Sequence, residues 1–250
     1  MAEPPAVLLI NHGSRQPHAA RFTYDVAAAL QREDPARVVR VSFLELAWPS
    51  PASALRQLAR DGILDVQVVP MLFSAGEHYR IDVPAAVDAA LESAPEMRVQ
   101  IAPPLLTDSH DDLIAALDAR LDEEIRDQPS SAGHAPDGLI LLAAGSSDRA
   151  ARAGVRGLAD AWGRAHVVPV ETAFCDLRGD DVRAAIATLT ARGAHRIACG
   201  SLFLATGRLL DAGRRAAGHA GVGTVAGPLG LTPALLGLLH RRCKQAVPAG

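Results

Sequence analysis

Lysine is almost absent from this chain of 250 residues: Lys244 is its one lysine, and arginine supplies the other basic side chains. A phosphate-binding P-loop needs a lysine directly after its glycines, so ATP chemistry of that kind is excluded. A Schiff-base lysine is excluded by the same scarcity. Aromatic residues make up only 4% and the formal net charge is −3. Both values argue against a nucleic-acid-binding surface, which needs stacking platforms or a basic face.

Cysteines and long apolar runs are also scarce. The three cysteines (Cys175, Cys199, Cys243) are odd in number and form no C-x-x-C pair, which indicates neither a disulfide scaffold nor a zinc knuckle. The apolar run Ala6–Ile10 is too short for a signal sequence, and Leu139–Ala144 falls far short of the ~20 residues of a membrane span. We therefore expect a cytoplasmic protein with no membrane or nucleic-acid partner.

Short apolar runs alternate with segments whose apolar residues recur every three or four positions. This alternation is typical of α/β proteins, in which helices cover both faces of a parallel sheet. The expected strands are Val7–Asn11, Val38–Leu44, Val66–Leu72, Arg98–Ala102, Leu139–Ala143, Val167–Ala173, Arg196–Leu202 and Val222–Ala226.

The two halves of the sequence repeat each other. Gly13 aligns with Gly145 at an offset of 132 residues, and Phe43 aligns with Phe174 at 131. Leu72-Phe73 aligns with Leu202-Phe203 at 130, after which one inserted residue is needed. We expect two flavodoxin-like, parallel-sheet (βα)4 domains, at residues 1–126 and 138–250, joined by a polar linker at 127–137. Such a pseudo-dimer is expected to be a monomer.

Two histidines and a carboxylate follow neighbouring strands of the first half. In a sheet of order 2-1-3-4, His12 follows the first strand, Glu45 the second and His78 the third. Ligands bind at the carboxyl edge of such a sheet, so these loops are expected to converge. Two imidazoles and a carboxylate suit a borderline divalent ion such as Co²⁺, Fe²⁺ or Ni²⁺, and they leave coordination positions open.

Each residue of this trio also has a plain structural interpretation. His12 could be a turn residue, His78 a solvated loop histidine and Glu45 an exposed strand end. The repeat favours function, because the second half has Ala144 and Leu209 where the first has its histidines, and keeps only an acid, Asp176. The histidines are thus not needed for the fold, and one active site is expected, in the first half.

Other side chains near the trio have weaker signals. Arg15 and Arg80 flank the histidines and could pair with substrate carboxylates, although surface charge explains either one alone. Small residues at 74–76 would let a flat ligand approach the backbone. Asp82-Val83-Pro84 is typical of a helix start, and a structural role suffices for it. No site role is expected for the remaining histidines: His18, His110, His134, His166, His195, His219 and His240.

These motifs together resemble a known family. The stretches 12–15 (His-Gly-Ser-Arg), 43–45 (Phe-Leu-Glu), 69–73 (Val-Pro-Met-Leu-Phe), 76–78 (Gly-Glu-His) and 82–84 (Asp-Val-Pro) are similar to those of the CbiX/SirB group of class II tetrapyrrole chelatases, in its long two-domain form. The resemblance implies a lyase that inserts Co²⁺ or Fe²⁺ into sirohydrochlorin without ATP, for cobalamin or sirohaem biosynthesis. The first half would be the catalytic chelatase-like domain and the second a degenerate repeat.

The same resemblance implies roles for individual residues. His12 would be a metal ligand and proton acceptor, His78 the second metal ligand, and Glu45 an acid near the metal or substrate. No tightly bound cofactor is implied, because the metal ion is itself a substrate. Substrate contacts would come from the loop after the third strand and its flanking arginines: Arg15, Phe73, Ser74, Ala75, Gly76, Glu77 and Arg80.

Three other interpretations of the sequence stay open at this point. A non-catalytic metal or tetrapyrrole carrier would use the same two histidines. A histidine phosphatase would need an arginine directly before His12, where Asn11 stands. A purely structural, degenerate chelatase-like protein is disfavoured by the intact trio of the first half.

Overall fold

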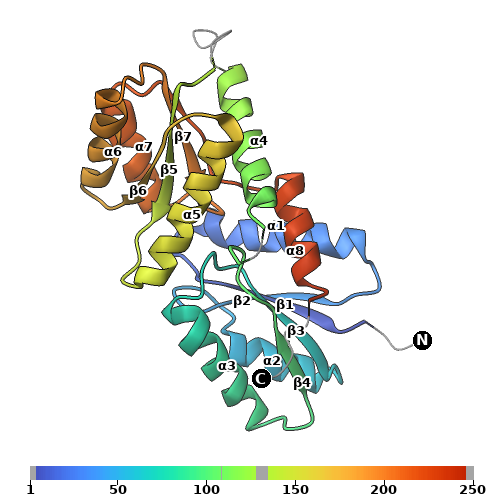
Figure 1. The fold of residues 1–250 in the computed structure, drawn as a ribbon. Helices are drawn as coiled ribbons and strands as arrows, with labels where there is room; N and C mark the ends of the chain where they lie inside the picture. Colours follow the sequence, from blue (N-terminus) through green and yellow to red (C-terminus); the bar gives the residue numbers. More distant parts are fainter. Residues whose placement is uncertain (1–3, 108, 128–134, 246–250) are drawn as a thin grey trace. The chain divides into compact units, whose positions relative to one another are not determined.

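A computed structural model describes residues 4–107, 109–127 and 135–245 (Figure 1). The strands are β1 (Ala6–Asn11), β2 (Val39–Phe43), β3 (Asp65–Pro70), β4 (Arg98–Ile101), β5 (Gly138–Ala144), β6 (Val170–Cys175), β7 (Ile197–Leu202) and β8 (Thr224–Val225). The helices are α1 (Pro17–Glu33), α2 (Pro51–Arg60), a π-helical turn η1 (His78–Asp82), α3 (Val83–Leu91), α4 (Asp111–Asp127), α5 (Arg149–His166), α6 (Asp180–Ala191), α7 (Arg208–His219) and α8 (Pro233–Arg242).

The strands form two parallel four-stranded sheets, in the orders β2-β1-β3-β4 and β6-β5-β7-β8. In each sheet the first strand lies between the second and the third, because β1 pairs with β2 and β3, and β5 pairs with β6 and β7. The expected α/β class, strand order and internal repeat are confirmed.

The sixth strand begins later than expected. The sequence favours a strand from Val167, because two valines precede Pro169. Val167 instead adopts a left-handed conformation (φ +56°) as the C-cap of α5, and β6 starts at Val170. The side chain of Val167 is 89% exposed. A β-branched residue rarely adopts this conformation, so the end of the helix outweighs its preference for a strand.

The repeat aligns more simply in the structure than in the sequence. Ala6 pairs with Val66 across β1 and β3, and Gly138 pairs with Ile197 across β5 and β7. Leu106 N donates to Phe73 O in the first sheet, and Gly230 N donates to Leu204 O in the second. Phe73 therefore corresponds to Leu204, at an offset of 131 residues. The expected match of Leu72-Phe73 to Leu202-Phe203 is wrong by one position, and no inserted residue is needed.

The chain divides into two compact units. Unit 1 takes the described residues up to Thr107 together with those from Leu236 onward, and unit 2 takes those in between. The helix α4 thus belongs to unit 2, where Asp118 accepts a hydrogen bond of 2.7 Å from Nε1 of Trp162 on α5. The end of α8 belongs to unit 1, where buried Arg242 donates to Pro104 O and Thr107 Oγ1.

The expected domain boundaries follow the repeat, whereas these units follow the packing of the helices. Part of the expected linker at 127–137, namely 128–134, lies outside the described residues, and so does the end of the second expected domain, 246–250. The division into 1–126 and 138–250 stays a prediction about segments of the chain.

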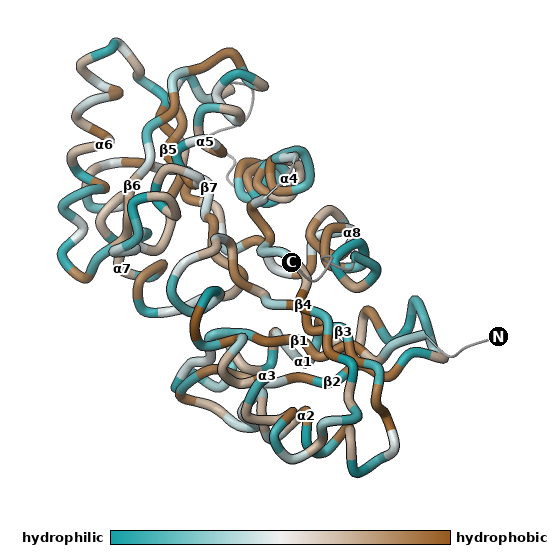
Figure 2. Tube along the Cα trace, turned by 60° about the horizontal axis from the view of Figure 1, so that its bottom comes forward, coloured by the Kyte–Doolittle hydropathy of each residue, from teal (hydrophilic) through white to brown (hydrophobic). Residues whose placement is uncertain are grey.

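Each unit has its own apolar core beneath its sheet. In unit 1 the core includes Leu8, Ile10 and Val68, and in unit 2 it includes Ile140 and Leu142, all of them fully buried. Full burial of one such side chain is worth about 1.5–3 kcal/mol. Figure 2 shows the apolar colour concentrated along strands such as β5, and α4 is apolar on one side and polar on the other.

Helices cover both faces of each sheet, as the near-continuous apolar strands require. In unit 2, α6 and α7 lie on one side and α4 and α5 on the other, and in unit 1, α2 and α3 lie opposite α1 and α8 (Figure 1). Within the part of the chain that the structure describes, no helix is both long and apolar enough to cross a membrane.

Candidate functional site

His12 stands directly after β1, where the backbone turns away from the sheet. Its N–H donates to Oδ1 of Asn11 (2.7 Å), and Nδ2 of Asn11 donates to Oγ1 of Thr23 on α1 (2.8 Å). The Asn11 side chain therefore holds the turn that presents His12 and anchors it to the first helix. His12 itself is half-buried.

Gly13 lets the loop after β1 approach the loop after β2. It has φ +98°, and a Cβ at this position would lie 1.8 Å from the carbonyl oxygen of Glu45. Glu45 N donates to His12 O over 2.9 Å, and Leu44 N donates to Asn11 O over 3.0 Å. Only glycine meets both the backbone angle and the close contact, and this contact places Glu45 beside His12.

His78 opens the π-helical turn η1, which leads into α3. Its Nδ1 atom lies 2.5 Å from Oδ2 of Asp82, the last residue of that turn. With Nδ1 engaged by a carboxylate, Nε2 is the ring atom left to bind a ligand. Single π-helical turns often mark functional sites in proteins, and a histidine oriented by a carboxylate is a recurrent arrangement in metal sites.

The three side chains predicted from the sequence meet in the structure. One ligand atom of each of His12, Glu45 and His78 lies within 4.8 Å of the others. The two imidazole rings are 4.6 Å apart between centroids and nearly perpendicular, at 88°. Both histidines are half-buried and Glu45 is exposed. This donor set suits a borderline divalent cation and leaves room in its coordination shell for another ligand.

No other group of three histidine, cysteine or acidic side chains in the described ranges is arranged to hold a metal ion. The expectation that the remaining histidines have no ligand role stays a prediction. His134 lies outside the described residues.

The other predicted site residues lie in the loops that carry the two histidines and in η1. Arg15 and Arg80 are exposed, Arg80 within η1 itself. Phe73 is half-buried, and its carbonyl accepts a hydrogen bond from Leu106 N. The segment 74–77 forms the loop before η1, and a Cβ at Gly76 would meet only the Ser74 hydroxyl, 3.9 Å away. Their expected role in substrate binding stays a prediction.

Asp82 is the residue that the sequence analysis missed. Its expected role was to start α3, and α3 does begin at Val83. The carboxylate, however, makes no capping hydrogen bond and contacts His78 instead. The spacing of four residues between His78 and Asp82 was the available signal, because side chains four apart meet on a helical turn.

The corresponding edge of unit 2 cannot hold a metal in this way. Ala144 and Leu209 stand where unit 1 has His12 and His78. The remaining acid, Asp176, accepts hydrogen bonds from the N–H groups of Gly179 (2.5 Å) and Arg178 (2.9 Å). The Gly179 hydrogen bond lowers the pKa of Asp176, and the Arg178 backbone and charge act in the same direction. Asp176 therefore stabilises the loop that follows β6, through hydrogen bonds to backbone N–H groups.

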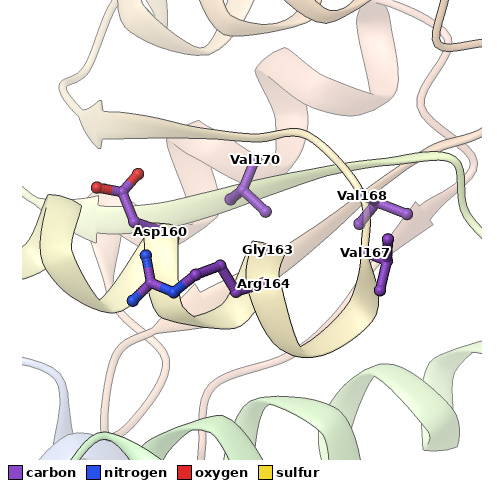
Figure 3. Close-up of a pocket in the computed structure, with 6 residues that line it drawn as sticks. All are labelled: Asp160, Gly163, Arg164, Val167, Val168 and Val170. Carbon is purple, nitrogen blue, oxygen red and sulfur yellow. The ribbon is translucent and has the colours of Figure 1, made fainter.

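A separate hollow lies in unit 2 at the end of α5 (Figure 3). Its lining combines one acid and one base with small or apolar residues: Asp160, Gly163, Arg164, Val167, Val168 and Val170. It contains none of the three clustered side chains, and no histidine or cysteine lines it. The metal-binding geometry thus belongs to unit 1.

The chain is similar in sequence to known proteins. The sirohydrochlorin cobaltochelatase of Priestia megaterium is 25% identical over 82% of this chain and 66% of its own length. That of Sulfurisphaera tokodaii is 30% identical over 50% of this chain and 98% of its own. The chain spans about two thirds of the length of the first of these relatives.

A solved structure shares the fold. SirB from Bacillus subtilis with Fe³⁺ has a TM-score of 0.79 and 20% identity, over 96% of this chain and 94% of its own. The CbiX family is matched by residues 6–124 and 138–246, which together make up most of the sequence. One of the two matched repeats keeps the His-Glu-His cluster and the other lacks it. Because the family match covers both repeats, the chain belongs to the CbiX family.

Proposed function

We propose that this protein inserts a divalent metal ion, Co²⁺ or Fe²⁺, into sirohydrochlorin without ATP. The observation that carries the proposal is the cluster of His12, Glu45 and His78, whose ligand atoms lie within 4.8 Å of one another. Relatives named sirohydrochlorin cobaltochelatase and sirohydrochlorin ferrochelatase support the choice of substrate and metals. The scarcity of lysine, which rules out a P-loop, supports a reaction that needs no ATP.

The chemistry requires a cation to be held and two protons to be removed. Insertion forms metal–nitrogen bonds and displaces two pyrrole N–H protons, so the site must offer both ligands and proton acceptors. His78, oriented by Asp82, is suited to hold the ion. His12 and Glu45 are suited to accept the protons and pass them to water, since both reach the solvent. General-base assistance of this kind is worth roughly 10²–10⁴-fold in rate.

The site is built for transient binding. A structural metal site is usually closed by four protein ligands, whereas this one offers three, all at least partly exposed. An ion held here keeps positions open for the nitrogen atoms that will receive it. Open positions favour metal insertion over the alternative of a carrier with the same histidines, which would hold its ligand without turnover. A monomeric state and the lack of a resident cofactor stay predictions.

The experiment supplies sirohydrochlorin with Co²⁺, Fe²⁺ or Ni²⁺ in separate anaerobic reactions and follows the change in absorbance. We expect catalytic turnover above the protein-free rate with Co²⁺ or Fe²⁺. His12→Ala and His78→Ala should abolish turnover, and Glu45→Gln should slow it by roughly 10²-fold or more. His18→Ala, which removes an exposed histidine on α1, is the matched control.

Two outcomes would contradict the proposal. Metal insertion by the His12→Ala variant at the wild-type rate would show that the cluster is not needed for the reaction. Stoichiometric capture of metal or tetrapyrrole, with no metallated product beyond the protein-free rate, would identify a carrier instead.

A further inference from the structure

Arg242, at the end of α8, is a charged residue buried in unit 1. It is only 3% exposed, and a buried charge is costly unless its polar atoms are hydrogen-bonded. Nε donates to Pro104 O over 3.2 Å, Nη2 donates to Thr107 Oγ1 over 2.9 Å, and Nη1 donates to Oε1 of Gln245. Two of these acceptors lie in the loop after β4, at residues 102–107. The arginine therefore fixes the loop 102–107 to the end of α8.

The loop 102–107 is hydrogen-bonded in turn to the segment that leads to His78. Leu105 N donates to Leu72 O over 2.8 Å. Leu106 N donates to Phe73 O, also over 2.8 Å. These hydrogen bonds continue the parallel pairing of β3 with β4 beyond the ends of both strands. The start of the segment that carries the histidine is thus attached to the loop that the arginine holds.

Tyr79 attaches the other end of this segment to the same loop. It directly follows His78 in η1 and is half-buried. Its hydroxyl donates to Ala102 O over 3.3 Å. Burial raises the pKa of the Tyr79 phenol and the charge of Arg242 opposes that rise, so the guanidinium lies near the phenol. His78 therefore belongs to a segment whose two ends, Phe73 and Tyr79, are both hydrogen-bonded to one loop.

The second repeat keeps the pairing of the loops but not the tyrosine. There Leu229 N donates to Phe203 O over 2.7 Å, so the backbone contact between the two loops is present. At the offset of 131 residues, however, Leu209 stands in place of the histidine, and fully buried Leu210 stands in place of the tyrosine. The backbone pairing is therefore a property of the fold, whereas the tyrosine accompanies the clustered histidine.

We propose that Arg242 and Tyr79 are positioning residues of the metal site. Through the loop 102–107 they fix η1 in place and so hold His78 against the other two members of the cluster. The proposal rests on the function proposed above, in its claim that His78 binds the metal. Asp82 orients the imidazole ring, whereas these two residues set where the turn itself lies. A site residue must be held within about 0.5 Å of its working position, so a looser turn weakens the grip on the ion.

Equilibrium titration of the full-length chain with Co²⁺, without tetrapyrrole and well below the melting temperature, tests the proposal. Tyr79→Phe removes only the hydroxyl, and we expect it to raise Kd for Co²⁺ roughly threefold, as for the loss of one net hydrogen bond. Arg242→Ala should raise Kd roughly tenfold or more. The visible absorption bands of bound Co²⁺ should shift in both variants, because they depend on the arrangement of its ligands. In turnover, the KM for Co²⁺ should rise with little change in kcat.

Two control variants separate positioning from general stability. Arg37→Ala removes a side chain that donates to Cys243 O over 3.0 Å, so it loosens the same chain end. Arg37 precedes β2, at the amino edge of the sheet, whereas His78 follows β3 at the carboxyl edge. This variant should melt at a lower temperature and keep the Kd and the absorption bands of the wild type. Tyr24→Phe makes the same chemical change in the other tyrosine of the chain, on α1, and should bind Co²⁺ like the wild type.

A milder variant keeps the test valid if Arg242→Ala does not fold. Thr107→Val keeps the shape of an exposed side chain and removes the hydroxyl that accepts from Nη2 of Arg242. It should raise Kd roughly twofold to threefold and shift the same absorption bands. Arg242→Lys keeps the charge but loses the planar fork, so its Kd should lie between those of the wild type and Arg242→Ala. Circular dichroism of each variant checks that the fold persists.

The outcomes separate this inference from the proposed function. Unchanged Kd and absorption bands in Tyr79→Phe and Thr107→Val, with Co²⁺ binding lost in His78→Ala, would overturn the inference and leave the proposed function standing. An equal loss of affinity in Arg37→Ala would assign the effect to stability and would also overturn the inference. Weaker Co²⁺ binding in the first two variants, with no metallated product from the wild type beyond the protein-free rate, would support the inference and overturn the proposed function. A wild type that binds neither Co²⁺ nor Fe²⁺ would overturn both.

Discussion

A carboxylate oxygen of Asp82 lies 2.5 Å from Nδ1 of His78, at the other end of a single π-helical turn. The contact fixes which ring nitrogen of His78 is available to an ion. It also limits rotation of the ring, so that the imidazole already points where His12 and Glu45 converge. Asp82 therefore acts through His78.

Removing this carboxylate should weaken metal binding. We expect Asp82→Ala to lower the affinity for Co²⁺ by about 10–100-fold, as is common when the partner of a metal-binding histidine is lost. Equilibrium titration with Co²⁺, in the absence of tetrapyrrole, measures the effect. Asp88→Ala, which removes an exposed acid from the next helix, α3, is the control. Equal affinities in both variants and the wild type would show that Asp82 does not position His78.

Gly13 should be required both for its backbone conformation and for the close approach of its loop to Glu45. Gly13→Ala forces a methyl group against Glu45 O, so the loops carrying His12 and Glu45 must separate. We expect a loss of more than about 1 kcal/mol of stability, because alanine is strained at positive φ, together with weaker Co²⁺ binding. Gly62→Ala is the matched control, since Gly62 has φ +80° and nothing within 4 Å of its added methyl. Thermal unfolding and Co²⁺ titration of both variants distinguish the backbone strain, which both share, from the steric clash with Glu45 O, which only Gly13→Ala has. Normal Co²⁺ binding by Gly13→Ala would show that the close approach of Gly13 to Glu45 is not needed to form the site.

Asp137 should stabilise unit 2 in a pH-dependent manner. Its Oδ1 accepts hydrogen bonds from the N–H groups of Arg196 (2.6 Å) and His195 (2.9 Å), and these, Arg196 first, lower its pKa. A lowered folded-state pKa means that the stabilisation is present above the unfolded value of about 3.9 and is lost as pH falls through the folded value. Asp137→Asn should thus melt below the wild type at pH 7, and the two should converge in acid.

Thermal melting as a function of pH tests this expectation. Asp122→Asn, which removes an exposed carboxylate of α4, is the control. A difference between Asp137→Asn and the wild type that stays constant down to acid pH would assign the effect to something other than ionisation.

The three thiols should be unreactive in the native protein. Burial raises the pKa of Cys175 and Cys199 to about 12 and that of Cys243 to about 11. At pH 8 we therefore expect slow labelling by a thiol reagent, and fast labelling of all three in urea, because the thiolate is the reactive form. Ser147→Cys adds an exposed thiol that should label at once. Rapid labelling of a native cysteine would show that the core around it opens.

The fold was largely predictable because its strands are short, apolar and repeated. Strand order followed from the parallel α/β pattern, and β1 and β5 lie where their apolar runs predicted them. The errors have local causes. Val167 was predicted to begin a strand, but the end of α5 draws it into a left-handed turn. The third repeat anchor was shifted by one residue because a Leu-Phe pair occurs at both places, whereas hydrogen bonding matches Phe73 to Leu204.

The part of the site that depends on strand order could be predicted from the sequence. His12, Glu45 and His78 each follow a strand of one sheet, so the strand order sufficed to group them. The contact of Asp82 with His78 was not predicted, because a helix start explains the position of Asp82 before Val83-Pro84 equally well. A π-helical turn also leaves no clear pattern in a sequence.

The assignment of α4 to unit 2, and of the end of α8 to unit 1, has a consequence for protein engineering. A cut within residues 127–137 would leave α4 on the N-terminal fragment, although α4 packs on β7 and β8 of the C-terminal fragment. The same cut would leave Arg242 on the C-terminal fragment, although it donates hydrogen bonds to Pro104 and Thr107 of the N-terminal fragment. Each excised half would expose an apolar sheet face and an unmatched helix. Separate expression of the repeats should therefore yield aggregating fragments, whereas co-expression of the same two pieces should reconstitute a folded complex.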